Sequence, residues 1–222
     1  MHSWFLYKYY DAAQTQICIT DSRITNNKTW RIPDIIDGKP VTAISSGAFC
    51  NRDDVETVYI PDSVSYIGCD AFKNCKKLQE VIFYKTSNPA KSLEICAWTF
   101  YGCTKLTVVN CFAPIYVRSF AFMECVALQN FNAKILAAEK KSFGKCAKLR
   151  TATFGKNAAW EENSFIGCKS LSQLFFYDVI AEHISRYEGK MKLLKGKVIS
   201  CTPNFNQIDL AYTGYNIDVS LS

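Results

Sequence analysis

The chain has 222 residues, of which 49% are hydrophobic and 21% are charged, and its formal net charge at pH 7 is +6. These values are typical of a well-packed globular protein, and the positive charge is smaller than a nucleic-acid-binding surface requires. No apolar run reaches about 18 residues, so we expect no transmembrane segment. The first residues lack a basic segment followed by an apolar one, which argues against a signal peptide.

Residues 1–40 are predicted to form a strand-rich N-terminal cap. Residues 5–10 and 15–20 are rich in aromatic and β-branched side chains, which is typical of short strands. Residues 29–33 form a further short strand in this interpretation. Residues 36–40, Ile-Asp-Gly-Lys-Pro, carry a turn signal that leads into the repeated part of the chain.

An apolar pattern repeats through residues 41–178, and phenylalanine marks its register. The pattern begins with an aliphatic or other apolar residue, at Ile44, Ile67, Ile95, Val117, Ala138 and Trp160. Successive phenylalanines lie 21 to 23 residues apart, with one step of 28, at Phe49, Phe72, Phe100, Phe122, Phe143 and Phe165. From the second repeat on, a cysteine follows three residues later, at Cys75, Cys103, Cys125, Cys146 and Cys168.

This periodicity predicts a solenoid in which each repeat adds one coil. Apolar residues nine and eleven positions after each phenylalanine have the two-residue spacing of a strand. The three-residue spacing of Phe, Cys and Leu favours a short helical or 3₁₀ turn. We therefore expect an α/β solenoid, a right-handed leucine-rich-repeat-like superhelix with a parallel β-sheet on the concave face and helical turns on the convex face. Stacked coils would place Phe on Phe as an internal ladder.

Two segments depart from the repeat. The 28-residue step inserts a loop at 84–92, and repeat proteins often place such loops on their binding face, although a tolerated surface loop is the simpler alternative. Residues 179–222 are predicted to form a C-terminal cap, with an amphipathic helix over 182–196 and a strand over 197–203. Cap, six repeats and cap are expected to form one continuous domain.

The pattern Ile-x-x-x-Ala-Phe-x-x-Cys-x-x-Leu-x-x-Val-x-Ile/Phe-Pro resembles the BspA-like (Treponema-type) leucine-rich repeat family. The segment Ile32–Phe49, IPDIIDGKPVTAISSGAF, resembles the N-terminal edge of that family. The resemblance covers about residues 30–177. It implies a curved solenoid at a bacterial or protist surface that acts in adhesion and protein–protein contact.

The eleven cysteines are interpreted as buried free thiols. Their number is odd, most fall at repeat positions, and no Cys-x-x-Cys pair or histidine cluster suggests a zinc site. Unpaired thiols and the missing signal peptide favour an intracellular protein, whereas the family resemblance implies a surface or secreted one. Both localisations remain open.

No motif predicts an enzyme. The internal histidine, His183, has Glu182 beside it, but adjacent residues on a helix do not face each other. The pairs Asp53–Asp54 and Glu161–Glu162 lie in turns without a partner in the sequence. We expect no catalytic residue, no cofactor and no metal ion.

The outward positions of the strands are the candidate binding surface. Ten and twelve residues after the phenylalanines, aromatic and polar side chains alternate, and exposed aromatic patches are typical of protein interfaces. We expect this surface to hold a protein or host-surface ligand, with no role in nucleic-acid binding. Binding of a carbohydrate or surface polymer by the same aromatics is the alternative, and the oligomeric state is left open. The candidate residues are Arg31, Tyr59, Ile82, Tyr84, Asn110, Phe112, Asn132, Lys134, Phe175 and Tyr177.

Overall fold

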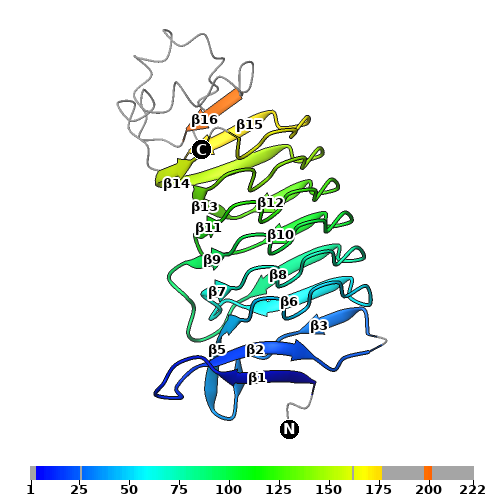
Figure 1. Ribbon diagram of the computed structural model, residues 1–222. Helices are drawn as coiled ribbons and strands as arrows, with labels where there is room; N and C mark the ends of the chain where they lie inside the picture. Colours follow the sequence, from blue (N-terminus) through cyan, green and yellow to red (C-terminus); the bar gives the residue numbers. More distant parts are fainter. Residues whose placement is uncertain (1–3, 26, 162, 177–197, 202–222) are drawn as a thin grey trace.

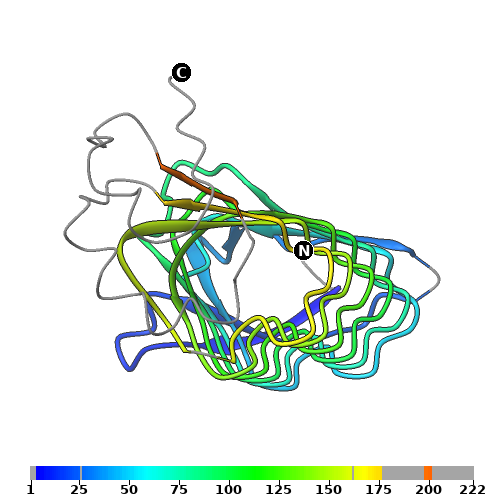
Figure 2. The same ribbon diagram turned by 90° about the horizontal axis from the view of Figure 1, so that it is seen from above.

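A computed structural model describes residues 4–25, 27–161, 163–176 and 198–201. The chain winds into a stack of coils, and each complete coil has a strand in two different sheets and a third side made of turns (Figure 1). Seen along the stack, successive coils superimpose around a common core (Figure 2). The predicted solenoid with a parallel sheet is confirmed.

The five-stranded sheet is parallel and contains the strand predicted at 29–33 and those predicted for the first four repeats, whereas the strands predicted at 5–10 and 15–20 and in the last two repeats belong to the second sheet. Its strands, in spatial order, are β12 (Asn130–Asn132), β10 (Val108–Asn110), β8 (Glu80–Tyr84), β6 (Thr57–Pro61) and β3 (Thr29–Arg31).

The second sheet has eleven strands and was not predicted as a sheet. The apolar residue that opens each repeat lies in one of its short strands, and its buried side chain faces the core. β1 (Phe5–Tyr9) and β4 (Ile35–Ile36) pair antiparallel with their neighbours, and the other pairings are parallel. The remaining strands are β2 (Ile17–Ser22), β5 (Lys39–Ile44), β7 (Tyr66–Ile67), β9 (Leu93–Ile95), β11 (Ile115–Val117), β13 (Lys134–Ala138), β14 (Thr151–Trp160), β15 (Gln173–Phe176) and β16 (Val198–Cys201).

The third side of the coil is built from linked turns, and the expected helical or 3₁₀ turns are not confirmed, since the described residues contain no helix. Residues two before and two after each of the first five phenylalanines adopt positive φ, as at Asp70 and Asn74, both with φ 57°. A left-handed residue on either side interrupts any helical run. The N–H of Phe72 therefore donates across to the carbonyl of Thr99 in the next coil, at 2.8 Å, instead of along its own segment.

The phenylalanine ladder is confirmed as the centre of the core. From Phe72 to Phe165 the rings stack with interplanar angles of 1 to 11° and centroids 5.0 to 5.4 Å apart. At the N-terminal end Trp30 continues the ladder, with its ring 5.4 Å from that of Phe49. Each such aromatic pair contributes about 0.5–1.5 kcal/mol beyond the burial of its surface.

Hydrogen bonding explains why cysteine occupies this position of the repeat. Each thiol donates to the carbonyl of the phenylalanine in the preceding coil, for example Cys125 Sγ to Phe100 O at 3.1 Å. The ten cysteines from Cys18 to Cys168 are free thiols, as expected. In the first coil Arg52 replaces cysteine, and its guanidinium donates to the cap carbonyls of Ser22 and Ile24 at 2.9 and 2.6 Å. The arginine thus joins the cap to the repeats.

The predicted C-terminal cap falls largely outside the described residues. The helix expected over 182–196 lies there, whereas β16 lies within the predicted strand at 197–203 and pairs with β15. Among the described residues no helix is long and apolar enough to cross a membrane.

Candidate functional site

The predicted outward column is in register across the five-stranded sheet. Parallel pairing places Arg31 opposite Tyr59, Tyr59 opposite Ile82, and Ile82 opposite Asn110, which in turn pairs with Asn132. These five side chains are exposed or half-buried, whereas the residues on either side of them in the strands are buried or at strand ends. One strand of each of five coils therefore contributes one side chain to a continuous surface.

Two candidate residues, Lys134 and Phe175, lie in the other sheet. Lys134 pairs with Thr153, and Thr153 pairs with Phe175, so both candidates belong to the eleven-stranded sheet. The corner between the two strands of a coil narrows along the stack: four residues separate β10 from β11, one separates β12 from β13, and β14 runs through the corner as one long strand. Tyr177 lies outside the described residues. The structure does not place Lys134 or Phe175 on the five-stranded sheet.

Tyr84 forms a fixed cluster with Arg31 and Tyr59. The guanidinium carbon of Arg31 lies 3.7 Å from the centre of the Tyr84 ring and 5.8 Å from that of Tyr59. The Tyr84 hydroxyl donates to the Ile32 carbonyl at 2.7 Å. Burial, with the nearby Asp34 carboxylate, raises the pKa of Tyr84 to about 12. The sequence predicted an exposed Tyr84, but the ring is half-buried because it packs against the end of the N-terminal cap.

Phe112 is the exposed aromatic of the group. Its side chain is 62% exposed, although residues just before it in the chain are buried. The ammonium nitrogen of Lys85 lies 5.3 Å from the ring centre. Burying a phenylalanine side chain contributes roughly 1.5–3 kcal/mol, and the exposed Phe112 ring does not gain this energy in the free protein. The ring can gain it when a partner covers this surface.

The inserted loop at 84–92 borders this surface. Asp62, which is 6% exposed, accepts hydrogen bonds from the Thr86 backbone N–H at 2.8 Å and its hydroxyl at 2.6 Å. The Asp62 carbonyl accepts a further bond from the Ala90 N–H at 2.7 Å. Both ends of the loop are thus hydrogen-bonded to Asp62. The loop places Lys85 next to the Phe112 ring. Asp62 was not among the residues predicted to act here, although an aspartate directly after Pro61 is a common turn residue.

The asparagines extend the surface as a polar ladder. Asn132 Nδ2 donates to Asn110 Oδ1 at 2.6 Å. Stacked amides in neighbouring parallel strands hold one another in one orientation. Within the described part of the chain no group of three His, Cys, Asp or Glu side chains is placed to bind a metal ion.

A comparison with protein families identifies the repeat. The model of the BspA type leucine rich repeat region matches residues 42–172 in six copies. The chain belongs to this family. The BspA-type repeat explains the in-register Phe, Cys and Leu columns, and the resemblance drawn from the sequence is confirmed.

Solved structures agree on the fold of this BspA-type protein. A crystal structure of a leucine-rich repeat protein from T. pallidum matches with a TM-score of 0.56 at 18% identity, covering 100% of this chain and 99% of that one. A leucine-rich repeat protein from Eubacterium ventriosum matches with a TM-score of 0.53 at 19% identity, covering 75% of this chain and 50% of that one. No curated protein matches the sequence.

Proposed function

We propose that this leucine-rich repeat protein is a non-enzymatic interaction or adhesion module that binds a protein partner on the outward face of the five-stranded sheet. The observation that carries the proposal is an exposed Phe112 beside a fixed Arg31–Tyr84 pair. Aromatic residues and arginine are enriched in protein interfaces and supply most of the residues whose truncation weakens binding. We call this set the strand-face patch: Arg31, Tyr59, Ile82, Tyr84 and Phe112.

Pre-organisation supports the same proposal. Arg31 is held over the Tyr84 ring, and Tyr84 is anchored through its hydroxyl to the cap. Ordering a side chain on binding costs about 0.5–1.5 kcal/mol, so residues that are already ordered retain that much more of their contact energy. The anchored loop at 84–92 extends this ordered surface from Tyr84 to Phe112.

Carbohydrate binding is the alternative, and the ring geometry favours it less. A sugar stacks on an open aromatic face, but the guanidinium of Arg31 covers one face of Tyr84 at 3.7 Å. Phe112 offers an exposed ring, with Lys85 above it. One exposed aromatic ring of this kind can pack against a protein side chain as well as against a sugar.

The test compares two substitutions that add the same charge at exposed apolar positions. Phe112→Lys changes the strand-face patch, and Val126→Lys changes a turn on another side of the coil, where the side chain is 41% exposed. Each protein is immobilised, and the proteins that it retains from an extract of its source cells are quantified in parallel with a glycan array. We expect the wild type and Val126→Lys to retain a common protein that Phe112→Lys loses.

Two results would count against the proposal. Equal retention by all three proteins would remove the strand-face patch as the binding surface. Retention of glycans alone, sensitive to Phe112→Lys, would replace the protein partner with a carbohydrate.

A further inference from the structure

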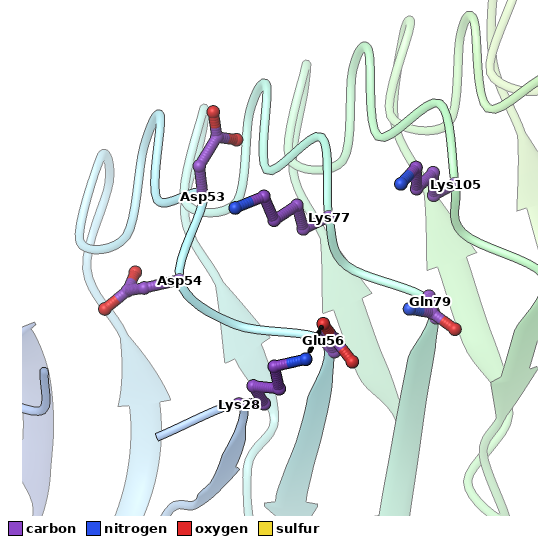
Figure 3. Close-up of a pocket in the computed structure, with 7 residues that line it drawn as sticks. All are labelled: Lys28, Asp53, Asp54, Glu56, Lys77, Gln79 and Lys105. Atoms are coloured by element: carbon purple, nitrogen blue, oxygen red, sulfur yellow. Dashed lines mark ion pairs between the residues drawn. The ribbon is translucent and has the colours of Figure 1, made fainter. Parts of the chain in front are cut away.

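A second surface, independent of the strand-face patch, lies where the turns enter the five-stranded sheet. A groove of about 460 Å³ runs here from the end of the N-terminal cap to the third coil. We call it the corner groove, and Figure 3 shows its lining residues: Lys28, Asp53, Asp54, Glu56, Lys77, Gln79 and Lys105. It lies at the beginning of β6 and β8, whereas Tyr84 lies at the end of β8.

The carboxylates of the corner groove come from the first coil. Glu56 pairs with Lys28 at 2.9 Å, and Asp54 pairs with Arg52 at 2.7 Å. The Arg52 guanidinium also holds the pKa of Asp54 below its usual value. Asp53 is exposed and accepts one hydrogen bond, from the Lys76 backbone N–H at 3.2 Å. Its charge is therefore the least compensated of the three.

The cations come from the next two coils. Lys77 and Lys105 occupy the same position of the repeat, directly before the buried Leu78 and Leu106. Both are exposed, and neither forms an ion pair with a carboxylate of the described residues. On the turns, by contrast, Lys73 pairs with Asp70 at 2.8 Å.

The uncompensated cations continue along the same corner of the solenoid. Further exposed basic residues without an ion pair inside the described ranges lie at adjacent positions of the second, fifth and sixth coils: Lys76, Lys148, Arg150 and Lys169. Successive coils are about 4.8 Å apart, so these cations form a row parallel to the solenoid axis that is interrupted at the fourth coil, where Val126 and Ala127 occupy the equivalent positions. The row starts beside the carboxylates of the first coil.

We propose that the corner groove binds an extended peptide segment of mixed charge. Two acidic side chains of the segment would contact Lys77 and Lys105, and a basic side chain would contact Asp53. Alternate side chains of an extended peptide are about 6.6–7 Å apart. The flexible four-carbon stems of the lysines accommodate the difference from the coil spacing. Gln79, between the charges, can both donate to and accept from a peptide backbone.

The carboxylates at one end of the corner groove argue against binding of a uniform polyanion. A nucleic acid or a sulfated polymer lying along the basic row would bring its charge against Asp53, Asp54 and Glu56. Like charges placed together cost several kcal/mol in an interface. A segment whose own charge changes sign satisfies both ends of the groove.

The experiment measures fluorescence anisotropy of a labelled peptide, acetyl-Lys-Ser-Glu-Ser-Glu-Ser-amide, with the wild-type chain. Lys77→Glu/Lys105→Glu is compared with a control of equal charge change, Lys91→Glu/Lys140→Glu, at exposed positions away from the groove. We expect the groove variant to weaken binding at least about tenfold and the control to change it less than about threefold. Raising the ionic strength from about 0.05 to about 0.5 M should weaken wild-type binding, because salt screens exposed charges.

Three results would overturn the proposal: no saturable binding to the wild type, an equal loss in both variants, or tighter binding of hexaglutamate or heparin than of the mixed-charge peptide. Thermal unfolding of both variants separates loss of binding from loss of fold. Because the corner groove and the strand-face patch share no residue, the Phe112→Lys variant should bind this peptide normally. The two proposals can therefore fail independently.

Discussion

At the scale of single residues, hydrogen bonds explain why cysteine and tyrosine stand where they do. A cysteine thiol is small enough for the core and can still donate to the phenylalanine carbonyl of the coil before it, as Cys103 does to Phe72 at 3.0 Å. That carbonyl also accepts the Cys75 backbone N–H at 3.2 Å, so the thiol supplies a second hydrogen bond, which contributes about 0.5–1.5 kcal/mol. Burial also raises the pKa of the Cys125 thiol well above its ordinary value, so this thiol remains protonated and can donate its hydrogen bond.

Tyr84 gives a pH-dependent prediction. Its pKa is raised from 10.0 to about 12 by burial and by the carboxylate of Asp34. The stabilisation from the neutral phenol is therefore complete below pH 10 and is lost as the pH rises through about 12. In a phenolate absorbance titration, the difference between the wild type and Tyr84→Phe should appear near pH 12. A difference centred near pH 10 would show that Tyr84 is solvated and the anchor to Ile32 is absent.

At the scale of the structural elements, a ring of the aromatic ladder contributes more to the stability of the fold than an exposed aromatic side chain does. The Phe100 ring is fully buried between the rings of Phe72 and Phe122, at centroid distances of 5.1 and 5.0 Å. Its removal leaves a cavity between coils that contact only their neighbours.

We expect Phe100→Ala to lower the free energy of unfolding by about 3–5 kcal/mol, because burial and stacking are lost together. Phe112→Ala, on the outer surface, should change it by less than about 0.5 kcal/mol. Urea denaturation of both variants checks this. Similar destabilisation by the two substitutions would mean that Phe112 is packed in the fold and is no free interaction residue.

The predictability of these elements from the sequence depends on how many residues carry each signal. The five-stranded sheet and the ladder could be predicted because each coil repeats several apolar positions in fixed register. The second sheet could not, since strands such as Tyr66–Ile67 are two residues long and offer no alternation to read. The expected helical turns were not confirmed, and the left-handed positions could not be predicted because Trp98 and Phe120 as well as Gly47 fill them, so no glycine pattern marks them.

At the scale of the whole molecule, the solenoid separates stability from recognition. The columns that define the BspA-type repeat face inward, and the positions that the repeat leaves free face outward. Arg31, Tyr59 and Ile82 could be identified from the sequence by counting from the phenylalanines. The corner groove could not, because its charges come from the cap and three coils and belong to no single motif.

Site-specific photocross-linking tests the strand-face patch most directly. A photoreactive amino acid replaces Ile82, at the centre of the outward column, and in a separate protein it replaces Val126 on the turns. After irradiation in an extract of the source cells, cross-linked polypeptides are separated and identified by mass spectrometry. We expect a discrete protein adduct from position 82 that is missing from position 126 and is abolished by Phe112→Lys. Adducts of equal yield from both positions, or none from position 82, would contradict binding at the five-stranded sheet.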